Sequence, residues 1–565
     1  LVAFVEAPPS PLPLKAFFTM PNKEFVVTAQ QVIEALKEKL PDVMIPRLFV
    51  QIKSMPLTVT GKIDRRRLRK EAEQLRSEEL LAWTGVEIDA LQPPQTVHEL
   101  LIHHLIVEVL KIPPSQVGME HNFFALGGDS VKAMKMVSRA RAAGVELMAT
   151  HIFAASNLRD LALVAAELGQ APSSEIDPNE PFSLLDAHTK AELISTAASV
   201  CGVEEGQIEN IYPCTPLQEG MVALSVSKPG AYIARFIHKL QPHVNIASLR
   251  RAWESVVQAS SILRTRMVTE ADGSRMFQVV LRESFQWDDE DPYMEINWDT
   301  YMKPQPTDTL LLGAPLVHAG ILTGSDTSSF ESDPRATYFV IMMHHSICDR
   351  WASGLMMDLL ETAYAGDCLV KNSMAPFIQY LSSQLVNPKS EEYWKSQFQG
   401  LAAEVFPALP SPGYNPVPSA SIQLSVPCLR DAPGGYTMSN VIRLAWAVVI
   451  SQYTSSPDVV YGVTVSGRAA PVANIEKMVA PIIATVPLRE RFNPEDTILA
   501  ALEAIQKQSN EMVSFEQFGL QRIRKVSRDA GDGCGFQSQL IVQPSWADES
   551  RPLLNTLEAG SSVVG

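Results

Sequence analysis

The sequence predicts a multidomain fold, in which a small α+β unit and a helical bundle precede a large α/β region. A chain of 565 residues is too long for one hydrophobic core, so about two to four domains are expected. The pattern also changes along the chain. Helix and strand signals mix up to residue 80, helical spacing dominates residues 95–168, and strands alternate with helices after residue 208.

The α+β unit is expected over residues 1–80. An amphipathic helix pattern over 32–40 precedes an apolar, strand-like run, Leu48–Ile52, and a turn follows around Gly61. The basic run over 65–70 is interpreted as a solvated helix face, because clustered like charges mostly face water.

Residues 95–168 are expected to form the helical bundle. Apolar residues recur there at helical spacing, and about 70 residues suffice for a domain that folds alone. Pro93 and Pro94 mark a linker before the bundle. Residues 169–207 are expected to be the linker after it, since their first part is rich in Pro, Ser and acidic residues.

The α/β region is expected to form two lobes, 208–405 and 406–565, divided at the linker-like segment 407–418. Alternating strand and helix patterns predict a layered sandwich in each lobe. Ser439 is expected to cap the helix that follows it. The clearest strand runs are 338–343 and 459–465, and the clearest helix runs are 249–259 and 439–453.

Composition argues against several kinds of protein. The formal charge of −16 disfavours nucleic acid as a partner, because phosphate binding needs clustered Lys and Arg. No apolar run reaches the roughly 18 residues that a membrane helix needs, and Glu6 with nearby prolines interrupts any signal peptide. The six cysteines show no CxxC pair or metal-ligand spacing, so free thiols in a cytoplasmic protein are expected.

The segment 122–130, which reads NFFALGGDS, carries the most specific signal. Its two glycines permit a tight turn, and Asp129 and Ser130 then open an apolar-periodic helix. A helix N-terminus favours an anion, which suits a serine hydroxyl that becomes a phosphodiester. A serine that merely caps the helix is the alternative, but the small helical domain and the phenylalanine pair that can anchor the loop favour a modification site.

A second motif, MMHHSICD, follows an apolar strand run at 342–349. The strand end offers a low-dielectric place for an imidazole that takes a proton. Adjacent strand residues point to opposite faces, so one of His344 and His345 can face a channel while the other packs inward. Asp349 needs an arginine partner if it is buried. A metal site is the alternative, and it is disfavoured because no third and fourth ligands lie nearby in the sequence.

The first motif resembles the LGGDS motif of the thiolation (peptidyl carrier) domains of nonribosomal peptide synthetases. This resemblance implies that Ser130 carries 4′-phosphopantetheine, with Gly128 and Asp129 completing the attachment motif. The thiol of that arm would hold an aminoacyl or peptidyl thioester. A phosphopantetheinyl transferase would be the partner that attaches the arm.

The second motif resembles the HHxxxDG motif of condensation domains. The resemblance makes His345 the catalytic histidine, next to His344, and Asp349 a structural carboxylate whose expected partner is Arg468. It implies two chloramphenicol-acetyltransferase-like lobes here and a four-helix bundle for the carrier. The wording of VSGR and ATVPLR is closest to fungal synthetases. Other condensation-domain motifs agree in order, at 212–221, 262–266, 462–468, 480–489 and 514–516.

Segments 40–46 and 56–65 resemble the last two motifs of adenylation domains. By this resemblance Lys62 is the mobile catalytic lysine of adenylate formation, while a lysine in a hairpin turn is the alternative. The resemblance covers only the small C-terminal subdomain, so the chain is not expected to activate an amino acid. The rest of that domain and the neighbouring modules are expected partners.

The favoured function is peptide-bond formation, in which an amine attacks a thioester held on Ser130, in a channel around His345. Two alternatives stay open: a terminal domain that cyclises and releases the peptide, and a non-catalytic module that only docks carriers. Arg350 motivates both, because it replaces the glycine of the family motif and could narrow the channel or bind substrate. An epimerase is less favoured. The end at Gly565 suggests an incomplete second lobe.

Overall fold

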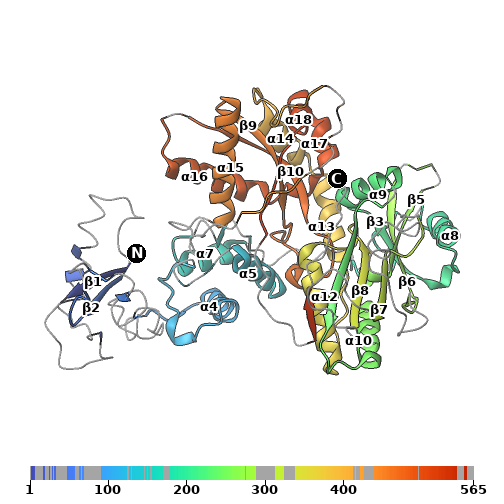
Figure 1. The fold of residues 1–565 in the computed structure, drawn as a ribbon, viewed down its shortest axis with the longest axis horizontal. Coiled ribbons are helices and arrows are strands. Elements are labelled where there is room, and N and C mark those ends of the chain that lie inside the picture. The colour runs from blue at the N-terminus through green and yellow to red at the C-terminus, as the bar shows by residue number, and fades with distance from the viewer. Residues whose placement is uncertain are drawn as a thin grey trace. The chain divides into compact units, whose positions relative to one another are not determined.

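The computed structural model describes most of residues 91–543, together with 553–556 (Figure 1). The longer gaps in that range are 169–176, 288–311, 324–336 and 425–436. Toward the N-terminus, it describes 2–6, 17–18, 48–57 and isolated positions up to residue 71. No helix among these residues is long and apolar enough to cross a membrane.

A parallel pair of strands is the described framework of the N-terminal part. β1 (Val2–Glu6) pairs with β2 (Leu48–Ile52). The strand predicted at 48–52 is therefore confirmed, whereas the sequence pattern does not predict β1. Lys62 and most of the helix pattern over 32–40 lie outside the described residues. The small apolar core of this part contains Phe18, Val50, Ile52 and Leu68.

The described part of residues 91–168 is mostly helical, as predicted. Its elements are α4 (Val97–Leu110), the short η3 (Pro114–Gln116), α5 (Ser130–Ala142) and α7 (Leu158–Leu168). Thr96 and Glu99 form a capping box at the start of α4, so two free amide groups of the first turn are satisfied. Arg159 Nε lies 3.1 Å from Glu99 Oε1, and this ion pair ties α7 to α4.

Two antiparallel sheets form the first lobe of the α/β region. One sheet has the strand order β3-β6-β5 and the other has the order β12-β4-β8-β7. The strands of these two sheets are β3 (Ile208–Pro213), β4 (Ile233–Leu240), β5 (Thr265–Thr269), β6 (Met276–Leu281), β7 (Val317–Thr323), β8 (Thr337–His344) and β12 (Leu554–Thr556).

Helices α10 (Ile246–Ala259) and α12 (Arg350–Tyr364) pack on one face of the four-stranded sheet (Figure 1). Alternate residues of β8 supply this face, because side chains alternate along a strand. Phe339 of β8 meets Trp253 of α10 edge to face, with ring centroids 5.4 Å apart. The strand predicted at 338–343 and the helix at 249–259 are both confirmed. Two further helices of this lobe are α9 (Pro216–Ser227) and α13 (Ala375–Leu385).

The predicted linker over 169–207 is wrong for part of its length. Residues 190–201 form helix α8 (Lys190–Cys201), whose buried face packs on the β3-β6-β5 sheet. Leu193 and Ala197 supply that face, together with Ile211 and Val279 of the sheet. Only the first part of the predicted linker is rich in Pro and Ser. Helix α8 lies beyond that part, where the composition no longer indicates a linker.

The second lobe is built on a three-stranded sheet with the order β10-β9-β11. The strands are β9 (Asp458–Val465), β10 (Ala484–Arg491) and β11 (Gln539–Ile541), so the strand predicted at 459–465 is confirmed. β9 and β10 lie between α15 on one side and α17 and α18 on the other (Figure 1). The helices are α14 (Pro388–Phe398), α15 (Met438–Thr454), α16 (Ile498–Met512), α17 (Leu520–Val526) and α18 (Arg528–Gly533).

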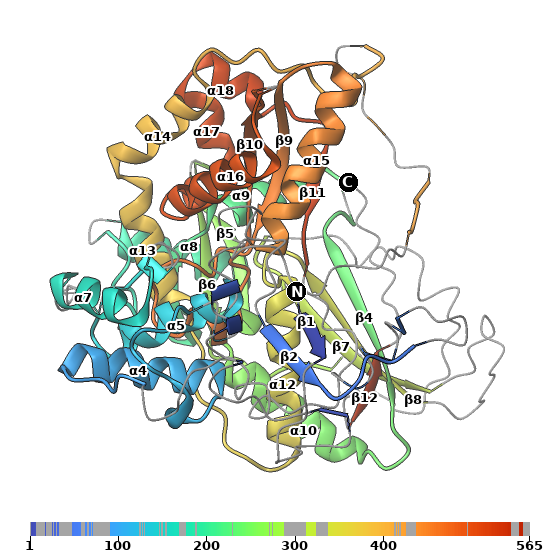
Figure 2. The same cartoon turned by 90° about the vertical axis from the view of Figure 1, so that its left-hand side faces the viewer.

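The predicted boundary between the lobes, at residue 406, is wrong in both directions. Trp394 and Phe398 of α14 belong to the core of the second lobe. Conversely, β12 pairs with β4 of the first lobe (Figure 2), and apolar residues of 470–482 enter the first lobe's core. Long-range packing crosses the boundary, so chain order alone does not define the lobes. Ser439 also is not a cap, since α15 begins one residue earlier, at Met438.

A buried ion pair holds the edge of the second lobe. Arg489 of β10 forms two bonds with Asp458 of β9, Nε to Oδ1 at 2.7 Å and Nη2 to Oδ2 at 2.6 Å. The same guanidinium donates to the carbonyls of Gln399 and Gly400, and Ala402 N–H donates to Asp458 Oδ2. Burial alone raises the pKa of Asp458, but these hydrogen bonds outweigh burial and lower it.

We predict that Asp458→Ala destabilises the second lobe by about 3 kcal/mol, because it leaves Arg489 buried without its carboxylate. Hydrogen exchange of β9 and β10 peptides measures the loss. In the parent, the contribution of Asp458 is present above about pH 4 and is lost as the pH falls, because the folded pKa is below the unfolded one. The more exposed pair Arg275–Glu270 is the control, and Glu270→Ala is expected to cost less than about 1 kcal/mol.

Two further carboxyl groups are buried in the second lobe, Glu490 on β10 and Glu516 in a short 3₁₀ turn. Burial raises the pKa of each to about 8, although the nearby Arg443 acts in the opposite direction. Oε1 of each has no hydrogen-bond partner among the described residues. Both carboxyl groups are therefore mostly protonated in the folded lobe at neutral pH. In the unfolded chain they ionise and release these protons.

This raised pKa predicts that the second lobe loses stability as the pH rises from about 5 toward 8, because the unfolded state binds fewer protons than the folded one. Glu516→Gln, which mimics the neutral acid, should make that loss less steep. Urea midpoints of the lobe at pH 6 and pH 9 test this. The exposed Glu495→Gln is the matched control, and a Glu516→Gln variant as steep as the parent would contradict the prediction.

Candidate functional site

The motif MMHHSICD lies at the end of β8 and in the turn that follows. The strand ends at His344, so His345 begins the turn rather than continuing the strand. The His345 N–H donates to Tyr232 O at 2.8 Å. Nδ1 of His345 is buried and has no hydrogen-bond partner in the described part of the chain. His345 as a whole is only partly buried.

His344 is enclosed, unlike its neighbour. Its side chain is 1% exposed, and both ring nitrogens meet serine hydroxyls: Nε2 lies 2.8 Å from Ser225 Oγ and Nδ1 lies 2.7 Å from Ser346 Oγ. Burial, with a smaller effect from His345, lowers the pKa of His344 to about 4. This histidine is therefore neutral at physiological pH, with no nitrogen left for a substrate.

Asp349 lies at the centre of a network between the two lobes. Its carboxylate caps α12, accepting from Ala352 N–H at 2.7 Å, and accepts from Ile482 N–H of the second lobe at 2.9 Å. Nη2 of Arg468 lies 3.4 Å from both carboxylate oxygens. Asp349 and Arg468 are almost completely buried. The chain between β9 and β10 thus supplies two of the three groups that surround this carboxylate.

Arg468 is itself held by backbone oxygens. It donates to the carbonyls of Ile475, Met478 and Ala480, at 2.6, 3.0 and 3.0 Å. Gly467 before it has φ +68°, and a Cβ there would lie 1.9 Å from Ile482 O. A glycine is needed at this position, because a side chain would push the arginine and the 475–482 loop apart.

Arg350 occupies the first residue of α12, and its side chain is exposed. It therefore does not belong to the buried network around Asp349. The next residue, Trp351, donates from Nε1 to Glu476 O at 2.9 Å, and its ring lies under the Arg468 guanidinium at 5.4 Å. This contact adds a further link between the lobes.

The other motif lies at the start of α5. Ser130 is the first residue of this 13-residue helix, whose first turn contains no acidic residue. A Cβ on Gly128 would lie 2.4 Å from the ring of the buried Phe123, so the turn before the helix needs a glycine there. A helix N-terminus and a tight glycine turn suit a phosphodiester on Ser130. Asp129 lies outside the described residues.

Sequence reasoning gives no role to Gln218, Ser225 or Ser346, which contact the histidine segment. Gln218 lies inside the 212–221 motif, so the motif draws attention to it without showing what it contacts. Ser225 follows seven residues later on the same helix, and this spacing places both on one face of α9. The spacing shows that the two residues share a face, but it gives no sign that this face contacts the histidine segment.

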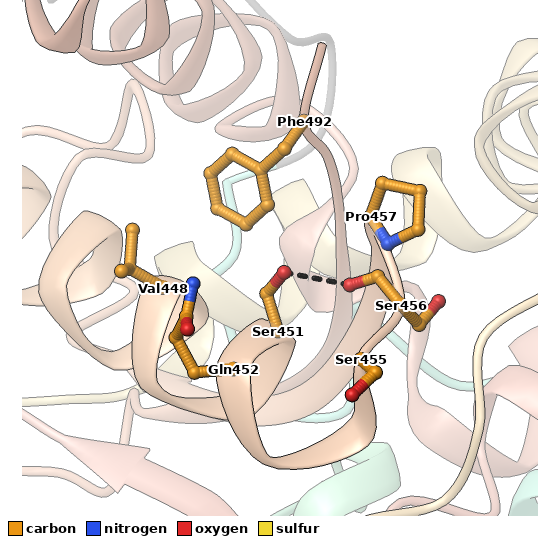
Figure 3. A pocket seen from close by; sticks show the side chains of 7 residues that line it. All are labelled: Val448, Ser451, Gln452, Ser455, Ser456, Pro457 and Phe492. Atoms are coloured by element: carbon orange, nitrogen blue, oxygen red, sulfur yellow. Dashed lines mark hydrogen bonds between the residues drawn. The ribbon is translucent and has the colours of Figure 1, made fainter. Parts of the chain in front are cut away.

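Other site types find little support in the described residues. No group of three or more His, Cys, Asp or Glu there can hold a metal ion. The five cysteines that the structure describes are unpaired. A surface hollow of about 370 Å³ lies in the second lobe, and it contains no titratable side chain (Figure 3). It is lined by Val448, Ser451, Gln452, Ser455, Ser456, Pro457 and Phe492.

Comparison with known proteins gives two matches to family models. Residues 208–560 match the condensation domain, and residues 101–164 match the phosphopantetheine attachment site. The first match includes His345, Asp349 and Arg468, and the second includes Ser130.

Curated relatives agree with these matches. The chain is 50% identical over 553 residues to the nonribosomal peptide synthetase fmqA of Aspergillus fumigatus, covering 97% of this chain and 14% of that protein. It is 37% identical over 536 residues to the synthetase notE of an Aspergillus species, covering 93% and 23%. The chain therefore spans less than a quarter of the length of either relative.

Solved structures are also similar. A structure described as "The crystal structure of CT" matches with a TM-score of 0.49 and 22% identity, over 67% of this chain and 85% of that one. The first condensation domain of the calcium-dependent antibiotic synthetase, with a substrate analogue, matches at 0.44 and 16%, over 59% and 81%. The family matches decide the assignment: this chain belongs to the condensation-domain family, and it also contains a phosphopantetheine attachment site.

Proposed function

We propose that His345 is the group that handles the proton during peptide-bond formation and that Asp349 and Arg468 hold its loop in place. The observation that carries this proposal is the contrast between the two adjacent histidines. His344 is enclosed by two hydroxyls, while His345 is only partly buried and its Nδ1 has no hydrogen-bond partner among the described residues. Only the second can accept a proton from a substrate amine.

The chemistry at His345 follows from this geometry. When Nδ1 carries the ring proton, Nε2 has a free lone pair that points away from the buried side. Nε2 then accepts the proton that the substrate amine loses as its nitrogen attacks the donor carbonyl. The carbon–nitrogen bond forms while the carbon–sulfur bond of the donor breaks, and the released sulfur takes up the proton that Nε2 returns. His345 therefore ends the cycle unchanged.

Ser130 is the proposed attachment residue, with Gly128 and Asp129 completing the attachment motif. A phosphopantetheine arm there supplies the thiol that carries the acyl donor. The residues of the chain contribute a helix N-terminus that suits the phosphodiester, and a turn that the Phe123 ring supports. A phosphopantetheinyl transferase is the proposed partner.

Several finer assignments rest on motif wording rather than on geometry. We propose that residues 1–80 are the C-terminal subdomain of an adenylation domain, with Lys62 as its mobile lysine. We propose that the carrier delivers the donor substrate, since it precedes the condensation domain in the chain, and that neighbouring modules supply the acceptor. We propose elongation rather than cyclisation, since elongation is the ordinary reaction of the condensation-domain family that the motifs resemble.

We predict that Ser130→Ala abolishes phosphopantetheine attachment. The parent chain, incubated with coenzyme A and a phosphopantetheinyl transferase, should gain the mass of one arm, because Ser130 combines the glycine turn with a helix N-terminus. Intact-protein mass spectrometry measures the gain. Ser138→Ala, in the same helix, is the matched control and should be labelled like the parent. Labelling that persists in Ser130→Ala would overturn the assignment.

His345→Ala and Asp349→Ala should fail in different ways. His345→Ala should lower the single-turnover rate by about 100-fold or more, because a general base usually accelerates a reaction by at least that factor. The melting temperature of this variant should be nearly unchanged. Asp349→Ala should lower stability by about 3–5 kcal/mol and activity with it, because Arg468 is left buried without its anion. The assay uses Ser130 loaded from an acyl-coenzyme A and an aminoacyl pantetheine thioester as the acceptor.

Thermal melts beside the rates separate the two roles. Asp349→Asn is the conservative variant, since it keeps an acceptor for the Ala352 N–H but loses the charge. If Asp349→Ala melts like the parent yet is inactive, the carboxylate takes part in the chemistry. If His345→Ala keeps the parent rate, the proposed function of this site is wrong.

A further inference from the structure

Helix α9 contacts the histidine segment at two points, two helical turns apart. Gln218 lies near its start and Ser225 near its end, seven residues later, so both lie on the same face. Ser225 meets the ring of His344, and Gln218 meets the backbone of Ser346. His344 and Ser346 flank His345 in the sequence. The helix therefore holds the chain on both sides of the proposed catalytic histidine.

The contact at Ser225 fixes the tautomer of His344. Ser346 N–H donates to His344 Nδ1 at 3.1 Å, so Nδ1 is an acceptor and carries no proton. Nε2 then carries the proton and donates it to Ser225 Oγ at 2.8 Å. The Ser225 hydroxyl can in turn donate to Met221 O at 2.9 Å or to Ala231 O at 3.0 Å. The imidazole is thus fixed between α9 and the turn after β8.

The contact at Gln218 fixes the backbone of the turn. Its Nε2 donates to Ser346 O and to Gln278 Oε1, both at 2.9 Å. Its Oε1 accepts from Thr215 N–H at 2.9 Å, so the amide cannot flip without losing all three bonds. Gln278 of β6 donates onward to Pro213 O at 3.1 Å. Gln218 and Gln278 are both fully buried.

A third contact comes from the same stretch of chain. The His345 N–H donates to the carbonyl of Tyr232, which lies shortly after α9 and just before β4. Tyr232 has φ +59°, a conformation that a non-glycine residue adopts at a cost. The segment 218–232 therefore restrains three consecutive residues, His344 by its ring, His345 by its N–H, and Ser346 by its carbonyl.

We propose that Gln218 and Ser225 are positioning residues for peptide-bond formation, which act by fixing the residues on either side of His345 so that its Nε2 stays aimed at the substrate amine. This proposal rests on the proposed role of His345. Neither residue contacts the reacting atoms, because Ser225 Oγ and Gln218 Nε2 are engaged within buried networks. Their effect on the reaction is therefore indirect, through the orientation of one imidazole.

Ser225→Ala and Gln218→Glu test the two contacts separately. Ser225→Ala removes the acceptor for His344 Nε2–H, whereas Gln218→Glu keeps the acceptor for Thr215 N–H but removes the donor to Ser346 O. Each should lower the single-turnover rate by about 10- to 100-fold, because small displacements of a catalytic group have effects of that size. The apparent KM for the aminoacyl pantetheine thioester should change by less than about twofold. Ser225→Thr, which keeps the hydroxyl, should restore most of the rate.

Two controls keep the outcomes distinct. Ser227→Ala removes an exposed serine of the same helix and should behave like the parent. In the His345→Ala background, Ser225→Ala should leave the residual rate unchanged, because a positioning residue has nothing left to position. Melting temperatures identify variants that fail to fold. If Ser225→Ala does not fold, Ser225→Thr and Gln218→Glu still decide the question.

Different results would overturn the positioning role of Gln218 and Ser225 and the proposed function of His345. Parent-like rates for both Ser225→Ala and Gln218→Glu, while His345→Ala is inactive, would reject the positioning role and keep the proposed function. A raised KM with an unchanged rate would place α9 in substrate binding instead. An active His345→Ala variant would reject the proposed function itself.

Discussion

The carboxylate of Asp349 is the point at which the two lobes meet, and the geometry of the site depends on it. It accepts hydrogen bonds from α12 of the first lobe and from Ile482 of the second, and it lies beside the Arg468 guanidinium. A buried charge is tolerated only where such partners surround it, because the loss of hydration must be offset. The same carboxylate therefore fixes the turn after β8 and the position of the 475–482 loop. A change in the relation between the lobes would change the place of His345.

The loop that carries His345 is restrained from opposite sides. Arg468 and Ile482 of the second lobe hold its far end at Asp349, while Gln218, Ser225 and Tyr232 of the first lobe hold its near end. Between these two sets the His345 ring makes no hydrogen bond among the described residues. A rigid frame around one unbonded imidazole suits general base chemistry, since the ring is oriented by its backbone and its Nε2 stays available.

The two adjacent histidines also show how burial assigns different roles to identical side chains. His344 faces two serine hydroxyls in a dry environment, which lowers its pKa to about 4 and keeps it neutral. His345 begins the turn after β8, and its side chain is only partly buried. The two histidines are adjacent in the sequence. Their rings nevertheless lie in different surroundings, because side chains alternate along a strand and β8 ends between the two residues. Burial, rather than the motif itself, makes the surroundings of the two imidazoles different.

The sequence by itself determined the carrier and condensation domain types, the attachment serine motif and the double histidine, because short motifs and hydrophobic period are local properties that need no contact to be read. It determined the strands at 48–52, 338–343 and 459–465 for the same reason. The tertiary structure alone decided where the lobes divide, since Trp394 and the 470–482 segment pack across the expected boundary. It also decided the contacts of Gln218 and Ser225, whose partners lie 128 and 119 residues away in the chain. Such contacts depend on how distant elements pack, and no periodicity within either segment encodes them.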